Sequence, residues 1–231
     1  MQLNAAQREL ALKIVYYGPG LSGKTTNLQA IHKRLDAASR GRLMTLDTAD
    51  DRTLFFDLLP IYFQSEGGLK VKIKLYTVPG QVMHNSTRRL VLRGADGIAF
   101  IADSQRSQSR ANNEYWQNML SNLRENGIEY GKIPIAVQFN KRDLPDIRSS
   151  EELGEIAERG REPIFEAIAI QGIGVLETFH GLLRMTWRDL EAKHDLKRKF
   201  GLREDEFLRS VFEKLDTTGC DLPPEILGGE S

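Results

Sequence analysis

Apolar stretches, some continuous and some alternating with charged residues, predict the strands of this chain. Residues 12–17 and 97–103 are continuous apolar runs that indicate buried strands, and residues 132–139 form a third. Residues 70–75 alternate apolar and charged side chains, which indicates a strand with one face in water. This strand follows residues 58–64 across a Ser-Glu-Gly-Gly turn, so the two are expected to pair as a hairpin.

Helical periodicity fills the segments between these strands. A helix is expected over residues 26–35, and the spacing of Ser149 and Glu152 is that of a capping box that opens another. Two further helices have apolar faces made by Tyr115, Trp116, Met119, Leu120 and Leu123 and by Leu176, Phe179, Leu183, Trp187 and Leu190. Strands that alternate with helices predict an α/β fold. We expect a mostly parallel six-stranded sheet with one antiparallel strand and helices on both faces.

The last part of the chain predicts an appendage to this fold. We divide the chain into a domain of residues 1–195 and a C-terminal extension of residues 196–231. The extension has one amphipathic helix, whose apolar face consists of Phe207, Leu208, Val211, Phe212 and Leu215. Such a face either docks on the domain, which is the commoner outcome for a short helix, or binds a partner. Proline and glycine pairs after residue 217 indicate a flexible end.

Composition narrows the classes of function. The 231 residues include 32 Lys or Arg and 32 Asp or Glu, so the formal net charge is zero. The chain therefore lacks the positive net charge that favours nonspecific binding to nucleic acid. One cysteine excludes an internal disulfide framework and is consistent with a reducing compartment. No apolar run is long enough to cross a bilayer, and neither a myristoylation site nor a prenylation box is present. We therefore expect a cytoplasmic protein without a direct membrane anchor.

One motif after the first buried strand indicates a phosphate site. The pattern G-x-x-x-x-G-K-[ST] is matched by Gly18, Pro19, Gly20, Leu21, Ser22, Gly23, Lys24 and Thr25. In such a loop, backbone N–H groups and the following helix N-terminus face the phosphates, so Thr26 joins the expected nucleotide-binding residues. Lys24 would reach the β- and γ-phosphates, and the Thr25 hydroxyl would bind Mg²⁺.

A second motif indicates the base. Asn140, Lys141 and Asp143 form an N-K-x-D element after the apolar run that ends at residue 139. A carboxylate at Asp143 can accept hydrogen bonds from guanine N1–H and the 2-amino group, whereas adenine has no 2-amino donor. A mismatch there would cost about 1–3 kcal/mol, so Asp143 predicts selection of guanine. Asn140 would tether the loop and the base, and the stem of Lys141 would lie over the ring.

These two motifs, with the elements between them, resemble the Ras-like small GTPases. Residues 15–21, 51–57, 75–81 and 139–145 resemble more narrowly the bacterial MglA group of polarity-regulating GTPases, over residues 10–192. The resemblance implies the Ras-like P-loop GTPase fold. It also implies a GTP-binding and GTP-hydrolysing switch that regulates cell polarity or motility, with an MglB-like roadblock activating protein and polarity or motility effectors as partners. Recruitment to cell poles would then occur through partners.

The resemblance assigns the switch residues. Gly80 would sense the γ-phosphate through its N–H, Gln81 would orient the attacking water, and Arg52 would act as an arginine finger supplied by the same chain. Thr53 would bind Mg²⁺ together with Thr25. A surface ion pair between Arg52 and Asp50 or Asp57 is the alternative for the arginine.

Two positions depart from the usual Ras-like pattern. Thr77 stands where that pattern has a Mg²⁺-linked aspartate, so either its hydroxyl holds a metal-bound water or another acid compensates. The candidate acids are Asp47, Asp50, Asp51 and Asp103. Ala169 matches the residue whose N–H meets guanine O6, but Ile170 stands where a lysine is common. A nucleotide-binding scaffold with little hydrolysis and a P-loop kinase or ATPase therefore stay open as alternatives.

Overall fold

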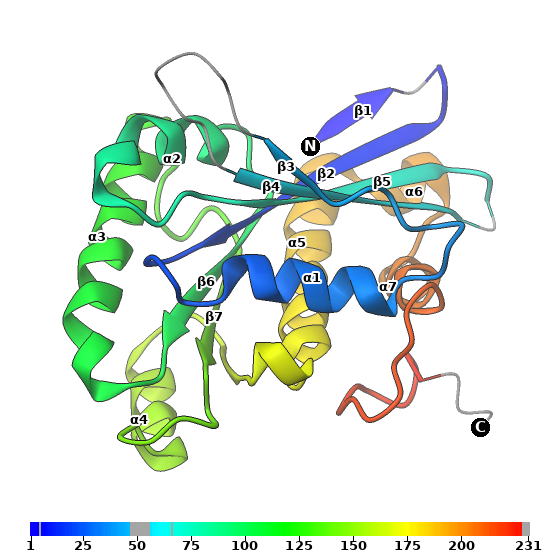
Figure 1. The fold of residues 1–231 in the computed structure, drawn as a ribbon. Helices are drawn as coiled ribbons and strands as arrows, with labels where there is room; N and C mark the ends of the chain where they lie inside the picture. The colour runs from blue at the N-terminus through cyan, green and yellow to red at the C-terminus, as the bar shows by residue number, and fades with distance from the viewer. Residues whose placement is uncertain (5, 47–55, 66, 228–231) are drawn as a thin grey trace.

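The computed structural model describes residues 1–4, 6–46, 56–65 and 67–227. Within them, eight strands form one sheet in the order β3-β4-β5-β2-β6-β7-β8, and β1 pairs with β2 (Figure 1). The strands are β1 (Gln2–Asn4), β2 (Glu9–Tyr17), β3 (Met44–Leu46), β4 (Phe56–Gln64), β5 (Lys70–Thr77), β6 (Gly97–Asp103), β7 (Ile135–Asn140) and β8 (Ile164–Glu166). The α/β class with a mostly parallel sheet is confirmed.

The number of strands and their directions differ from the sequence prediction. Strands β5, β2, β6, β7 and β8 are parallel, and β4 is antiparallel to β5 as the hairpin predicted. In addition, β1 is antiparallel to β2 and β3 is antiparallel to β4, so the sheet has eight strands instead of six. Both additions are three residues long, which is too short for a hydrophobic period to be recognised.

Helices cover both faces of the sheet. They are α1 (Lys24–Arg34), α2 (Asn85–Leu92), α3 (Ser109–Glu125), α4 (Ser150–Arg159), α5 (Val175–His194), α6 (Leu196–Phe200) and α7 (Glu204–Phe212). Short 3₁₀ turns are η1 (Val82–His84), η2 (Arg106–Gln108) and η3 (Ala169–Gln171). In Figure 1, α2, α3 and α4 lie on one side, and α1, α5 and α7 lie on the other. The predicted capping box is present, since Ser149 and Glu152 bond each other's backbone N–H at the start of α4.

Alternating side chains of β2 belong to two separate cores. Leu12 and Ile14 pack into the core beneath α1, α5 and α7, whereas Val15 and Tyr17 pack into the core beneath α2 and α3. Strand β6 has α5 on one face and α3 on the other, whereas β5 keeps Lys70, Lys72 and Lys74 on a partly exposed face. The carboxyl ends of the parallel strands lie at one edge of the sheet. This is the edge at which the site lies.

The extension docks on the domain. Phe207 of α7 stacks on Trp187 of α5 at 4.5 Å between ring centroids, and Phe212 lies 5.9 Å from Phe179. Both phenylalanines are buried. Leu222 and Ile226 are buried in the same core. Proline and glycine predicted a flexible end after residue 217, but these two side chains attach its described part to the domain. A second helix, α6, precedes the predicted one.

Backbone hydrogen bonds tie the extension to the end of α1. The Asp36 N–H donates to the Lys214 carbonyl at 2.9 Å, and the Asp216 N–H donates to the Arg34 carbonyl at 2.8 Å. The Arg34 guanidinium also donates to the Asp216 carbonyl at 2.7 Å. The extension is therefore attached both by apolar packing and by paired main chain.

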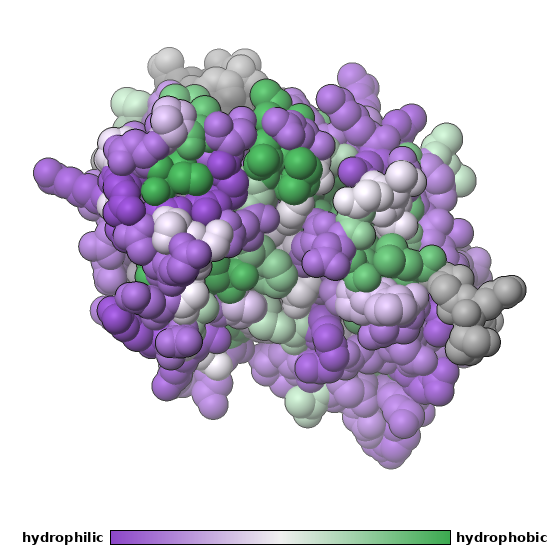
Figure 2. Space-filling model, turned by 90° about the horizontal axis from the view of Figure 1, so that it is seen from below, coloured by the Kyte–Doolittle hydropathy of each residue, from purple (hydrophilic) through white to green (hydrophobic). Residues whose placement is uncertain are grey.

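The surface has no single large apolar face in the view of Figure 2, where hydrophobic groups are separated by hydrophilic side chains. Of the helices in the described ranges, none is both long enough and apolar enough to cross a membrane.

Candidate functional site

The phosphate loop connects the carboxyl end of β2 to α1. At Gly23 the backbone has φ 100°, a left-handed value that L side chains rarely adopt. A Cβ atom there would lie 2.1 Å from Nδ2 of Asn140. Both the conformation and the close approach of Asn140 therefore require glycine at this position.

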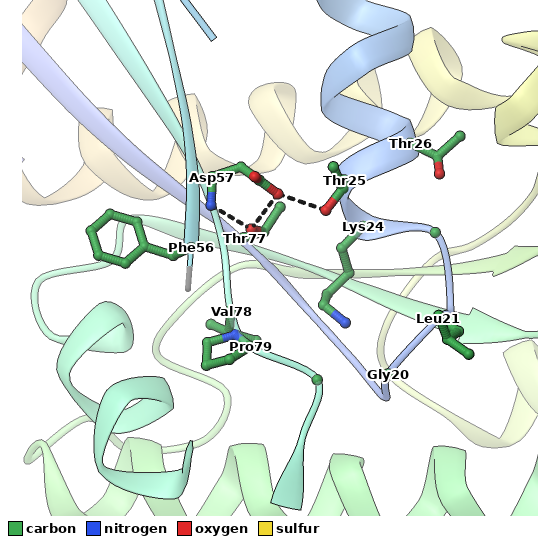
Figure 3. A pocket seen from close by; sticks show the side chains of 12 residues that line it. Gly20, Leu21, Lys24, Thr25, Thr26, Phe56, Asp57, Thr77, Val78 and Pro79 are labelled. Carbon is green, nitrogen blue, oxygen red and sulfur yellow. Dashed lines mark hydrogen bonds between the residues drawn. The ribbon is translucent and has the colours of Figure 1, made fainter. Parts of the chain in front are cut away.

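Lys24 begins α1 and turns back over the loop. Its ammonium donates to the carbonyls of Gly18 at 2.9 Å and Pro19 at 2.6 Å, and the residue is only 6% exposed. In Figure 3 the Lys24 side chain extends between the phosphate loop and the segment that carries Val78 and Pro79. Burial, and after it the charge of Arg88, lower the pKa of Lys24 to about 7, while Asp57 acts in the opposite direction.

Phosphate groups beside Lys24 would raise its pKa again, and this gives a pH-dependent prediction. With a pKa of about 7, Lys24 would lose its proton above that pH in the protein alone and regain it beside a phosphate. We expect GDP binding to nucleotide-stripped protein at about pH 8.5 to take up close to one proton, and to take up almost none below about pH 6. Calorimetric titrations in two buffers of different ionisation enthalpy measure this uptake.

The control variants separate Lys24 from other groups. Lys24→Arg should reduce the uptake because a guanidinium keeps its proton. Lys33→Gln, an exposed position on the same helix, should leave it unchanged. Identical binding heats in both buffers at every pH would show that Lys24 stays charged throughout.

A carboxylate lies where the usual Ras-like aspartate is missing. Asp57 Oδ2 accepts from the Thr25 hydroxyl at 2.6 Å and from the Thr77 hydroxyl at 2.9 Å, and the Asp57 N–H donates to Thr77 Oγ1 at 2.8 Å (Figure 3). Asp57 is buried at the start of β4, next to the end of β5. Among the acids considered from the sequence, Asp103 is instead bonded to Lys141, and residues 47–55 lie outside the described residues.

Sequence reasoning placed Asp57 only as a partner for Arg52. The signal that was available is a carboxylate at the beginning of an otherwise apolar strand, where a charge is costly unless it has a partner.

The segment after β5 touches the phosphate loop. A Cβ atom on Gly80 would lie 2.3 Å from the Gly20 Cα, so two glycines are needed for this contact. The Gly80 carbonyl accepts from the Tyr115 hydroxyl at 2.7 Å. Gln81 is exposed, with its amide oxygen 3.1 Å from Nε2 of His84.

The predicted guanine loop is tied to the phosphate loop through Asn140. Its Nδ2 donates to the Ser22 carbonyl at 2.8 Å, and its Oδ1 accepts from the Ala169 N–H at 2.9 Å. The Ala169 N–H expected to meet guanine O6 thus bonds to Asn140. Lys141 forms an ion pair with Asp103 at 2.6 Å, and Asp143 is exposed.

Buried side-chain amides connect α1 to the sheet and to α5. Asn27 and Gln138 exchange two hydrogen bonds of 2.8 and 3.0 Å, and Gln138 also donates to Thr178 at 2.8 Å. All three residues are fully buried. The network joins α1, β7 and α5, so the helix that begins at the phosphate loop has a fixed direction.

One cavity of about 430 Å³ collects most of these groups. Its lining consists of Gly20, Leu21, Gly23, Lys24, Thr25, Thr26, Phe56, Asp57, Thr77, Val78, Pro79 and Gly80. The guanine loop does not line this cavity, but Asn140 bonds to Ser22 in the phosphate loop that does. The structure thus brings together the predicted phosphate and base loops with Thr77 and Gly80, while Arg52 and Thr53 fall in the part of the chain that it does not describe.

Loops for phosphates and for guanine, at the carboxyl edge of a mostly parallel sheet, are the defining arrangement of Ras-like P-loop GTPases. No protein-family model matches the chain. Over 189 residues, the chain is 44% identical to the Mutual gliding-motility protein MglA of Myxococcus xanthus (strain DK1622). The matched region covers 82% of this chain and 97% of that protein. The chain belongs to the MglA family of small GTPases. It is accordingly a GTP-hydrolysing switch, and small GTPases generally use Mg²⁺.

Proposed function

We propose that this chain is a GTP-dependent switch for cell polarity or gliding motility whose hydrolytic site is complete because Asp57 supplies the carboxylate missing at position 77. The observation that carries this proposal is the bonding of Asp57 to both Thr25 and Thr77. A switch of this kind alternates between a GTP state that binds effectors and a GDP state that does not.

The oxygen atoms around Thr25 suit Mg²⁺. This ion prefers hard oxygen ligands and binds through one or two carboxylates together with substrate phosphates. The described residues contain no group of three or more His, Cys, Asp and Glu side chains placed to hold a metal ion. Thr25 and Thr53 would hold the ion directly, with Asp57 orienting the Thr25 hydroxyl or a bound water. When bound, Mg²⁺ neutralises charge on the β- and γ-phosphates.

Hydrolysis would depend on four residues of the two switch segments and the phosphate loop. Lys24 would contact the β- and γ-phosphates, and the Gly80 N–H would contact the γ-phosphate. Gln81 would orient the attacking water, and Arg52 would stabilise the charge of the transition state. Phosphoryl transfer needs mainly positioning and charge stabilisation, which these residue types supply.

The base site would be formed around Asn140. Asp143 would accept two hydrogen bonds from guanine, and the Lys141 stem would cover one face of the ring. Ile170, which is 80% exposed beside Ala169, would offer an aliphatic surface in place of the usual lysine. Ala169 would contribute its N–H, shared with Asn140.

The partners follow from the family. The relative from Myxococcus xanthus is named for gliding motility, which supports polarity or motility effectors for this chain. We propose an MglB-like roadblock protein as the activating partner. We also propose that this chain is cytoplasmic and reaches cell poles through such partners. A scaffold with little hydrolysis is the second candidate function. The bonds of Asp57 to Thr25 and Thr77 argue against this alternative, because Asp57 would supply the carboxylate whose absence at position 77 motivated it.

Nucleotide preference tests the base site. Asp143→Asn should weaken GDP binding and shift preference toward xanthosine diphosphate, because the exchanged donor and acceptor match a carbonyl at position 2 of the base. The expected loss for GDP is about 1–3 kcal/mol, which is about 5- to 150-fold in affinity. Competition against labelled GDP measures it.

The matched control is Asp146→Asn, another exposed carboxylate in the same loop, which should change nothing. If ATP displaces labelled GDP from the unaltered protein as effectively as GTP does, the assignment of the base site is wrong. Single-turnover GTP hydrolysis with and without the activating protein distinguishes a switch from a scaffold.

A further inference from the structure

Arg88 is a buried arginine next to the catalytic segment. It lies on α2, is 3% exposed, and its guanidinium is 5.2 Å from the ring centroid of Tyr115 on α3. Arginine is rarely buried to this extent without specific partners, because its charge must be compensated by hydrogen bonds. The neighbouring Arg89 is about half exposed and forms an ion pair with Glu125.

The partners of Arg88 include carbonyl groups of the segment that carries Gln81. Its Nη1 donates to the carbonyls of Pro79 at 3.4 Å and Gln81 at 2.5 Å. The carbonyl between them, that of Gly80, accepts from the Tyr115 hydroxyl at 2.7 Å. Three successive carbonyls are therefore held by two side chains that contact each other.

The Arg88 side chain is itself anchored. Arg88 Nε donates to Asn118 Oδ1 at 2.9 Å, and the Tyr17 hydroxyl donates to the same oxygen at 2.5 Å. Asn122 donates to the Tyr17 hydroxyl at 3.1 Å. Because Tyr17 is the last residue of β2 before the phosphate loop, the network connects the base of that loop with residues 79–81.

The held segment is the one that approaches the phosphates. Gly80 is in contact with Gly20 of the phosphate loop, so a small displacement of its backbone would change the direction of its N–H. Arg88 is also close enough to Lys24 for its charge to lower the pKa of that lysine.

We propose that Arg88 is a positioning residue for GTP hydrolysis: together with Tyr115 it holds the carbonyls of residues 79–81 and so directs the Gly80 N–H and the Gln81 side chain toward the γ-phosphate. Arg88 acts through the backbone and does not touch the nucleotide. The inference rests on the roles proposed above for Gly80 and Gln81.

The test compares nucleotide states in three variants, Arg88→Met, Arg88→Lys and Tyr115→Phe. A misplacement of about 1 Å can cost about 10²-fold in rate, so we expect single-turnover hydrolysis by Arg88→Met to fall by about 10- to 100-fold. Tyr115→Phe removes one hydrogen bond, so a loss of about 2- to 12-fold is expected. Arg88→Lys should remain impaired, since one ammonium cannot replace a fork that reaches several acceptors.

A purely structural role of Arg88 would lower the affinity for both nucleotides equally, so the measurement that decides is the difference between triphosphate and diphosphate affinity. Affinity for guanosine 5′-O-(3-thiotriphosphate) should fall in each variant, while GDP affinity stays within about threefold, because only the triphosphate meets the Gly80 N–H. Arg89→Ala is the matched control and should behave as the unaltered protein.

Two results would overturn the inference. One is equal loss of affinity for both nucleotides, and the other is full hydrolysis in Arg88→Lys or in both Arg88→Met and Tyr115→Phe. If Arg88→Met does not fold, Arg88→Lys and Tyr115→Phe carry the test. Failure of the unaltered protein to bind and hydrolyse GTP would instead overturn the proposed function, so the two failures are distinguishable.

Discussion

Replacing Phe207 and Phe212 together by alanine is expected to remove much of the stability of the whole domain. Each ring is fully packed, and truncating a buried phenylalanine costs about 3–5 kcal/mol of unfolding free energy. Total stabilities of domains are about 5–15 kcal/mol, so two such losses bring the protein near the unfolding threshold. Thermal denaturation should show a midpoint lowered by about 10 °C or more.

The matched control is Phe200→Ala, because Phe200 lies in the same extension but is only partly buried. Its effect should be clearly smaller. Proteolysis adds a second measurement, since undocking of α7 in the double variant should release a fragment that begins near Lys197. An unchanged midpoint and unchanged resistance to protease would mean that the docked extension contributes little to stability.

Arg52→Ala and Gln81→Leu should each abolish stimulation of GTP hydrolysis by the activating protein while GDP affinity is retained. An arginine finger contributes about 10³–10⁵ in rate in other GTPases, because the guanidinium neutralises charge that develops only in the transition state. The glutamine orients the water, so its loss acts on the same step. Single-turnover rates of GTP hydrolysis in the presence of the activating protein measure the effect of each substitution.

Arg42→Ala serves as the control, since Arg42 is an exposed arginine on the connection that leads toward residue 52. Unchanged stimulation in Arg52→Ala, with loss in Gln81→Leu, would assign Arg52 to a structural ion pair and the catalytic charge to the partner.

Much of the fold could be predicted from the sequence because its main signals are local. Gly97–Asp103 is a continuous apolar run and was predicted with the bounds that the structure has. Strong helical stripes likewise located α3 and α5. The phosphate loop was found because its chemistry needs glycines, lysine and a hydroxyl at fixed spacing within one turn.

Asp57 and Arg88 could not be recognised because their roles depend on contacts between distant segments. Asp57 meets Thr77 only in the register that pairs Leu58 with Tyr76, and a slip of one residue would turn it to the other face. Arg88 and Arg89 are adjacent arginines on one helix, and the packing of α2 on α3 alone decides which is buried. In the same way, Leu222 and Ile226 are buried only because the domain offers an apolar face to a segment rich in proline and glycine.

The docking of the extension also has a consequence for biosynthesis. A ribosome makes the chain from its N-terminus, so Phe63 and Trp187 are complete before Phe207, which packs against both, has been added. At about 5–20 residues per second, the 18 residues from the end of α5 to the end of α7 take about 1–4 s to synthesise. During this interval Phe63 and Trp187 lack the ring that packs on them in the finished protein, and apolar surface exposed in this way is prone to aggregation until α7 has been made.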